Sequence, residues 1–147
     1  TFRYRVAPLA GEPDRARMFE LAQRLAAGVR ETHVEKEDLD VRRHVYPELR
    51  GVPASASFCE LEGQATLTSL RLVAGALEAR VFNPCEESAR CAIRLPLLEA
   101  EGRLGGAEFV NLESAPLGET LEWREGRVEF TLAPKQIRTL RVEIREK

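Results

Sequence analysis

Apolar and polar residues alternate with a period of two along the second half of the chain. In the stretch RVEFTL, Val128, Phe130 and Leu132 lie on one side of an extended strand, and Glu129 and Thr131 lie on the other. The stretch LRVEIR near the C-terminus repeats this alternation. Strands with one apolar and one polar face are typical of antiparallel sheets that pack on a single core.

Short segments of this kind follow one another after residue 55, and turn residues separate most of them, among them glycine, proline and asparagine and, before residue 107, the pair Gly105-Gly106. They are residues 57–61, 66–73, 76–83, 89–97, 107–113, 119–124, 127–132 and 136–145. This spacing predicts a mostly β fold, an antiparallel β-sandwich of about seven to eight strands.

Residues 13–28 have the period of a helix instead. Met18, Leu21 and Leu25 recur at three- and four-residue spacing, which gives the segment one apolar stripe. Gly28 is a natural end for such a segment. We therefore expect one N-terminal helix, followed by a charged and exposed loop.

The length of 147 residues fits one domain. We expect residues 1–54, with the helix and the charged loop, to pack on the sandwich formed by residues 55–147, so that both belong to one structural domain. The sequence begins at Thr1 rather than at a methionine. This suggests a processed product or a piece of a longer polypeptide.

The strand predicted at residues 76–83 ends on Asn83 and Pro84. Proline has no N–H to donate to a sheet, and an asparagine side chain can bond backbone groups at a turn. We therefore predict that the chain leaves the sheet here and that Asn83 has a structural role.

The formal net charge is −2, so electrostatics give no reason to expect nucleic acid or an anionic membrane as a partner. No apolar run approaches the roughly 20 residues that span a bilayer, and the first residues lack the apolar stretch of a signal peptide. The basic residues are nearly all arginine, which is typical of a G+C-rich bacterial genome. We therefore expect a bacterial protein located in the cytoplasm.

The three cysteines are Cys59, Cys85 and Cys91. Cys85 and Cys91 flank the turn after Asn83, so a disulfide between them is one alternative. Reduced, partly buried thiols are the favoured alternative for a cytosolic protein. The sequence has no CxxC pair, and it therefore does not predict a thiolate metal cluster.

The remaining residues give little sign of catalytic chemistry. His33 and His44 lie eleven positions apart without a paired ligand motif, and we interpret them as surface histidines rather than zinc ligands. The acidic run at residues 35–40 is interpreted as a solvated face. The sequence contains no nucleophile elbow and no phosphate-binding loop. We therefore predict no catalytic residue and no metal ligand in this chain.

Trp123 is the only tryptophan, and it lies beside a predicted turn. An indole ring at such a place could stack on a sugar, or it could pack in the core or against another domain. The packing interpretation is favoured. Trp123 is the one candidate here for a contact with a sugar or a domain.

Three stretches resemble, in the order in which they occur, parts of a known family. They are SFCELEGQATLTSLRLVAGALEARVFNP, AEFVNLESAPLGE and LAPKQIRTLRVEI. The first ends in an Arg-Val-Phe-Asn strand, the second has a Leu-Glu turn, and the third has a Pro followed by Ile-Arg-Thr-Leu. This order resembles the C-terminal region of the retaining α-mannosidases of glycoside hydrolase family 38. The N-terminal FRYRVAPLAGE is similar to a stretch that comes earlier in the same region.

The resemblance implies structural positions rather than catalytic ones. In the family, the nucleophile and the zinc ligands belong to a large catalytic domain upstream of this region, and none of those motifs is present here. The positions that match the family's motifs are Arg80, Asn83, Glu113 and Thr139. The resemblance places them in the sandwich that packs behind the catalytic domain.

The resemblance therefore implies a non-catalytic C-terminal β-sandwich of an α-mannosidase-like glycoside hydrolase. The parent would hydrolyse terminal α-mannosides with retention, using zinc held by its catalytic domain, and this chain would hold no cofactor and be inactive alone. The expected partner is the remainder of the parent polypeptide, with a carbohydrate and a second copy of the chain as further partners. The alternative is a stand-alone sandwich that binds carbohydrate or another protein.

Overall fold

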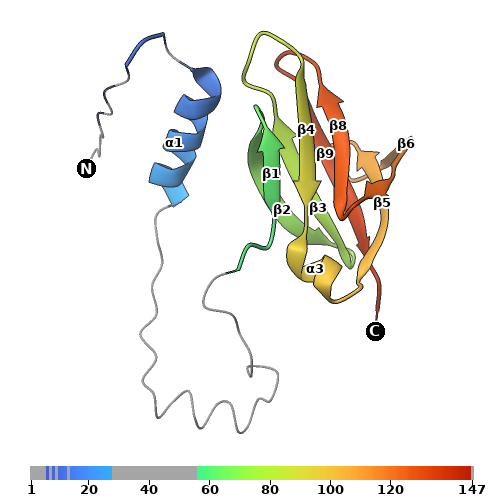
Figure 1. The fold of residues 1–147 in the computed structure, drawn as a ribbon. Coiled ribbons are helices and arrows are strands. Elements are labelled where there is room, and N and C mark those ends of the chain that lie inside the picture. Colours follow the sequence, from blue (N-terminus) through green and yellow to red (C-terminus); the bar gives the residue numbers. More distant parts are fainter. Residues whose placement is uncertain (1–5, 7, 9, 13, 28–55, 147) are drawn as a thin grey trace, which may run out of the picture.

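The computed structural model describes residues 6, 8, 10–12, 14–27 and 56–146. Over these residues the chain forms two antiparallel sheets, of four and five strands, that lie face to face as two layers, with one helix at their side (Figure 1). The prediction of a mostly β antiparallel sandwich with an N-terminal helix is confirmed. The charged loop lies outside the described residues, and with it His33, His44 and the acidic run at residues 35–40.

The described elements have the following bounds. They are α1 (Arg15–Ala27), β1 (Glu60–Gly63), β2 (Thr66–Val73), β3 (Ala76–Phe82), β4 (Ala89–Arg94), α3 (Pro96–Ala100), β5 (Leu104–Val110), β6 (Pro116–Leu121), β7 (Trp123–Arg124), β8 (Arg127–Leu132) and β9 (Ile137–Ile144). The four-stranded sheet has the order β1-β4-β8-β7, and the five-stranded sheet has the order β2-β3-β9-β5-β6.

The core lies between the two sheets. In β8 the predicted alternation is observed, because Val128, Phe130 and Leu132 are buried while the residues between them are exposed. These side chains meet the inner face of the other sheet, where the rings of Phe109 and Phe130 contact edge to face with centroids 5.6 Å apart. Removal of this apolar surface from water is the main source of stability. The other buried members of the core include Leu77, Val81, Ile93, Leu95, Leu140 and Val142.

The predicted strands at residues 66–73 and 127–132 have the bounds observed for β2 and β8. The strand predicted at 89–97 is too long, because β4 ends at Arg94 and the short helix α3 follows. Pro96 occupies the first helical turn, where a missing N–H costs nothing. The apolar run LPLLEA is too short for its period to separate a helix from a strand.

The predictions at residues 107–113 and 119–124 were also wrong at their bounds. Strand β5 begins earlier, because Gly105 is part of the strand rather than of a turn. A Cβ at Gly105 would lie 2.7 Å from both the Cβ and the backbone oxygen of Glu143, so only glycine allows β5 and β9 to approach there. The second segment divides into β6 and β7, which belong to different sheets.

Helix α1 contacts the sandwich at the edge formed by β2 (Figure 1). The ring of Phe19 meets the ring of Phe82 edge to face at 5.5 Å, and the side-chain amide of Gln23 donates to the backbone oxygen of Leu67 at 2.9 Å. The apolar stripe that predicted the helix is only partly covered, since Met18 remains 38% exposed. The helix therefore packs on the sandwich through a few contacts rather than through a broad apolar face.

The Asn83 side chain explains why β3 ends where it does. Asn83 is fully buried, and its amide nitrogen donates to the backbone oxygens of Glu87 at 2.7 Å and of Ala133 at 3.0 Å. Its side-chain oxygen accepts a hydrogen bond from the backbone N–H of Cys85 at 3.0 Å. The backbone N–H of Asn83 donates to the backbone oxygen of Gln136 at 2.9 Å. One side chain thus joins the loop after β3 to the loop after β8, which agrees with the structural role predicted for this residue.

We expect Asn83→Ala to lower the free energy of unfolding by about 2–4 kcal/mol, because it leaves several buried backbone groups without partners. Asn83→Asp should cost at least as much, since a carboxylate oxygen would then face backbone oxygens. Urea unfolding followed by circular dichroism measures both. The matched control is Asn111→Ala, whose side chain also bonds its own turn but is exposed. Equal losses at the two positions would contradict the role assigned to Asn83.

Candidate functional site

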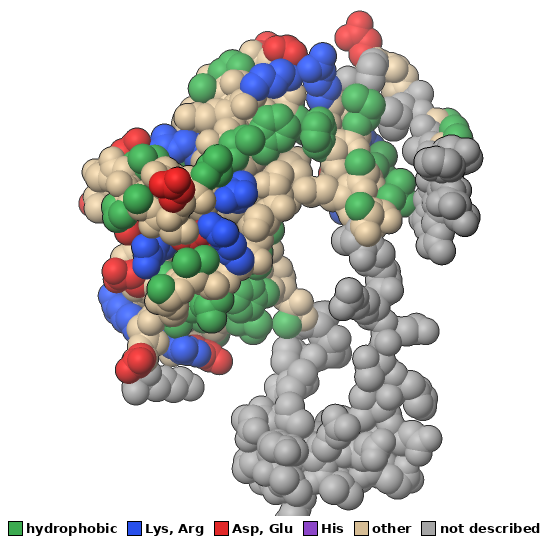
Figure 2. Space-filling view, turned by 180° about the vertical axis from the view of Figure 1, so that it is seen from behind, with side chains coloured by type: hydrophobic (Ala, Val, Ile, Leu, Met, Phe, Trp, Pro, Cys, Tyr) green, Lys and Arg blue, Asp and Glu red, His purple; other side chains and the backbone are tan. Residues whose placement is uncertain are grey.

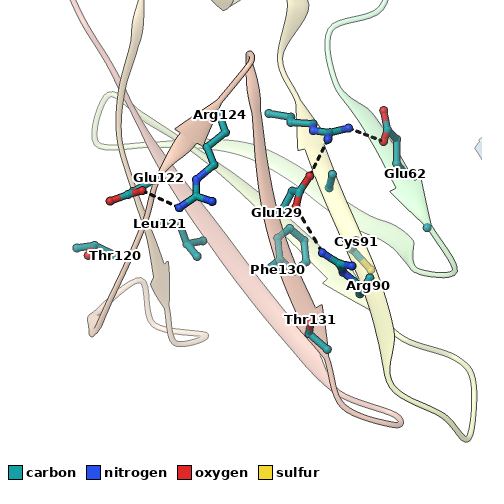
Figure 3. Close-up of a pocket in the computed structure, with 13 residues that line it drawn as sticks. Glu62, Arg90, Cys91, Thr120, Leu121, Glu122, Arg124, Glu129, Phe130 and Thr131 are labelled. Atoms are coloured by element: carbon teal, nitrogen blue, oxygen red, sulfur yellow. Dashed lines mark hydrogen bonds and ion pairs between the residues drawn. The ribbon is translucent and has the colours of Figure 1, made fainter.

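A hollow with a volume of about 880 Å³ lies on the outer face of the four-stranded sheet (Figure 3). Strands β1, β4 and β8 contribute its floor, and the end of β6 together with β7 contributes one side. Figure 3 shows that charged and hydroxyl side chains of these strands lie around it. The charged ones are Glu62, Arg90, Glu122, Arg124, Arg127 and Glu129.

These charges already neutralise one another. Arg127 lies 2.9 Å from Glu129 and 3.9 Å from Glu62, and Arg90 lies 3.8 Å from the second oxygen of Glu129. The side chains are largely exposed, so water screens each pair and each adds little stability. Among the described residues that line the hollow there is no imidazole. The hollow therefore has the character of a solvated, ion-paired surface.

A second hollow of about 480 Å³ lies between α1 and the strands β1 and β2. Cys59 is part of its wall. Burial, together with a smaller effect of the nearby charge of Glu60, raises the pKa of the Cys59 thiol to about 11. A thiol with this pKa is protonated at neutral pH and is therefore a poor nucleophile and a poor metal ligand.

The outer face of the five-stranded sheet contains a buried carboxylate. Glu78, on β3, is 1% exposed, and its Oε2 accepts hydrogen bonds from Arg71 Nε at 3.0 Å and Nη2 at 2.7 Å. Its Oε1 is buried and has no hydrogen-bond partner among the described residues. A buried charge is costly unless it is paired. The Arg71 contact is therefore what allows Glu78 to lie in the sheet.

Two further arginines lie beside this pair. The strand register places Arg141 next to Glu78 and Arg80 next to Thr139. Arg80 Nε donates to Thr139 Oγ1 at 3.4 Å, and Arg141 Nη1 donates to the backbone oxygen of Ser114 at 3.4 Å. Within the described part of the chain, neither guanidinium has a carboxylate oxygen within 4.0 Å. The register also pairs Arg141 with Glu108, on β5, so Arg141 lies between two acidic residues on this face.

The turn between β5 and β6 lies over the same face. Asn111 closes this turn, because its side-chain oxygen accepts the N–H groups of Glu113 and Ala115, both at 2.9 Å. Arg71 Nη2 donates to Ser114 Oγ at 3.2 Å and so ties the turn to the Arg71–Glu78 pair. Glu113 is exposed at the tip of this turn.

The structure brings together two of the four positions that the family resemblance implies. Arg80 and Thr139 are hydrogen-bonded on adjacent strands, and Asn83 follows β3 directly. Glu113 lies apart from them, on the turn. Sequence reasoning did not single out Glu78 or Arg141. The one signal in the sequence was that each is a charged residue on the polar side of its strand. The pairing of those two strands could not be deduced from that pattern.

Trp123 joins the two sheets. It lies on β7 of the four-stranded sheet, and its indole Nε1 donates to the backbone oxygen of Gly105, on β5 of the other sheet, at 3.0 Å. The ring is half-buried and packs against the core. Its use as a sugar-stacking surface stays a prediction.

The three cysteines are free. Across residues 14–27 and 56–146, no three His, Cys, Asp or Glu side chains are grouped so that they could hold a metal ion. Neither described helix is long and apolar enough to cross a membrane. Comparison of the chain with protein-family models, with curated proteins and with solved structures gave no match.

We expect Arg71→Leu to lower the free energy of unfolding by about 2–3 kcal/mol, because Glu78 is then left buried and unpaired. The loss should be below that of a fully buried pair, since the Arg71 side chain is 42% exposed. The double variant Arg71→Leu/Glu78→Leu should recover most of the lost free energy of unfolding. Urea unfolding of the single and the double variant measures this. Arg90→Leu, in the exposed pair with Glu129, is the control and should cost less than about 1 kcal/mol. A loss for Arg71→Leu no larger than the control would show that the pair is not structural.

The raised pKa of Cys59 predicts slow alkylation. At pH 8 we expect iodoacetamide to modify Cys59 at least about tenfold more slowly in the folded chain than in urea, because only the thiolate reacts. The rate should keep rising with pH up to about 11. Mass spectrometry of the Cys59 peptide measures it, and Cys59→Ser confirms the assignment. A folded-state rate that is half-maximal near pH 8.5, the pKa of an ordinary thiol, would disprove the shift.

Proposed function

We propose that this chain is a non-catalytic β-sandwich that packs against and supports the catalytic domain of an α-mannosidase-like glycoside hydrolase. The observation that supports this proposal most is the set of contacts that three of the motif positions make. Arg80 and Thr139 are bonded across two central strands, and Asn83 holds the loops at the end of the same sheet. Residues with these contacts maintain a scaffold, which is the role the resemblance implies for them.

The surface chemistry favours packing over catalysis. The charges of the large hollow are paired with one another, and the thiol of the second hollow is protonated at neutral pH. General acid–base chemistry requires a group with a pKa near the working pH in reach of a substrate. In the proposal, the retaining hydrolysis of terminal α-mannosides belongs to the partner domain.

We likewise assign the zinc of the proposed parent to its catalytic domain. The described residues of this chain do not fit a zinc site, since none of their His, Cys, Asp or Glu side chains form a group of three. A catalytic zinc site in proteins needs about three such ligands. The proposal therefore gives this chain no step in the reaction.

The natural size of the polypeptide tests the proposal. An antibody raised against this chain should detect, in an extract of the source cells, a band far heavier than 16.5 kDa. The purified polypeptide should hydrolyse an aryl α-mannoside and lose this activity when zinc is chelated. The 147-residue chain alone should show no turnover above a heat-killed control, with or without zinc.

A natural band at 16.5 kDa would contradict the proposal. It would favour the stand-alone sandwich that binds carbohydrate or another protein. Turnover by the repurified 147-residue chain would contradict the non-catalytic role directly.

A further inference from the structure

Three of the four strands that form the sheet edges have sequences that hinder the addition of another strand. The edge strands are β1 and β7 of one sheet and β2 and β6 of the other. β1 has four residues, two of which are Glu60 and Glu62, and β7 has only two residues. β6 begins at Pro116, which has no N–H to donate, and Gly118, with a φ of 75°, interrupts its extended backbone. Short length, charge, proline and irregular backbone are the usual means by which proteins protect an edge.

The fourth edge strand, β2, is long and nearly uncharged. It has eight residues, and its single charged side chain, Arg71, is bound to Glu78 on the neighbouring strand at 2.7 Å. Leu70 and Leu72 are paired with buried residues of β3, so they lie on the inner face of the sheet, yet they are 38% and 67% exposed. An edge of this length and composition is the kind to which another strand adds.

Helix α1 covers the first part of this edge. The side-chain amide of Gln23 donates to the backbone oxygen of Leu67, on β2, at 2.9 Å. Because α1 lies beside β2 on the side away from β3 (Figure 1), this oxygen is an acceptor that an added strand would use. The helix and an added strand therefore compete for the same position on β2.

The contacts that hold α1 in this place are few. Phe19 meets one aromatic ring of β3 and remains 43% exposed, and the ion pair of Arg15 with Glu86, at 2.9 Å, is exposed to water. Met18 and Leu25 are 38% and 41% exposed, and Figure 2 shows apolar side chains exposed along the helix. The helix thus gains little stability from burial, and it lies outside the core that joins the two sheets. Its departure would leave the sandwich intact.

A second copy of the chain fits the edge that α1 leaves. Two copies of β2 bring no unpaired charge toward each other, because Arg71 already has the carboxylate of Glu78. Antiparallel pairing about a two-fold axis joins two identical edges, uses both, and therefore ends at a dimer. Leu70 and Leu72 then gain cross-strand neighbours that cover their exposed surface.

We propose that α1 is a displaceable cover of the β2 edge, and that β2 pairs with β2 of a second copy when the helix leaves. With α1 in place the chain is a monomer, because Gln23 occupies the edge at Leu67. The pairing does not depend on the proposed function.

Loosening the helix in the 147-residue chain tests this cover. Phe19→Ala/Gln23→Ala removes two of its contacts with the sandwich. The matched control is Arg24→Ala/Leu25→Ala, which truncates two side chains on the other side of the same helix. We expect hydrogen exchange of the α1 amides to be at least about tenfold faster in the first variant than in the control. At equal protein concentration, light scattering should give twice the mass of 16.5 kDa for the first variant only.

An added charge identifies the strand that pairs. In the Phe19→Ala/Gln23→Ala background, Leu70→Lys should return the mass to 16.5 kDa, because a lysine on an edge strand opposes strand addition. Leu117→Lys adds the same charge to β6, the other edge of the same sheet, where Leu117 is 49% exposed. It should leave the dimer unchanged. Circular dichroism spectra and urea midpoints confirm that the variants are folded.

Arg15→Glu keeps the test available if Phe19→Ala/Gln23→Ala does not fold. It sets two carboxylates side by side at the exposed contact with Glu86 and should also give dimers, in a smaller fraction. Four results would each overturn the cover: α1 amides that exchange no faster than in the control, a monomer although they exchange faster, equal dimer in the control, and a dimer that persists with Leu70→Lys.

Discussion

The antiparallel pairing of β3 with β9 is the constraint on which both faces of the five-stranded sheet depend. Each of the seven residues of β3 has a partner on β9, from Ala76 with Glu143 to Phe82 with Ile137. A shift by one residue would turn the apolar side chains of both strands out of the core. The same register that builds the core therefore decides which charges are neighbours on the outside.

The outer face of this sheet shows how a sandwich can hold charge without opening its core. Glu78 is buried, yet it lies on the side of β3 that faces away from the other sheet, and Arg71 and the turn tied to it by Ser114 lie over that face. The four-stranded sheet instead leaves its charges in water, where pairing costs and gains little. Arginine and glutamate thus have a structural role on the five-stranded sheet and form a solvated surface on the four-stranded sheet.

Local signals were enough for much of the fold. Regular alternation bounded by turn residues predicted β2 and β8 correctly, whereas Gly105 was misjudged because its reason lies in Glu143, on another strand. Arg71 and Glu78 could have been paired from sequence, since they flank the tight turn at Ala74 and Gly75. The neighbours of that pair on β9 could not, because non-local strand order is not encoded in any single segment.

The shortness of β7 has a consequence for solubility. β7 pairs with only Arg127 and Val128 of β8, so residues 129–132 have no strand partner on that side within the described chain. An unpaired strand edge is a template on which other chains can add strands and begin to aggregate. Here Glu129 and its ion-paired arginines lie along that edge. The hydrated charges make the approach of a second flat strand costly, so they oppose strand addition at this edge.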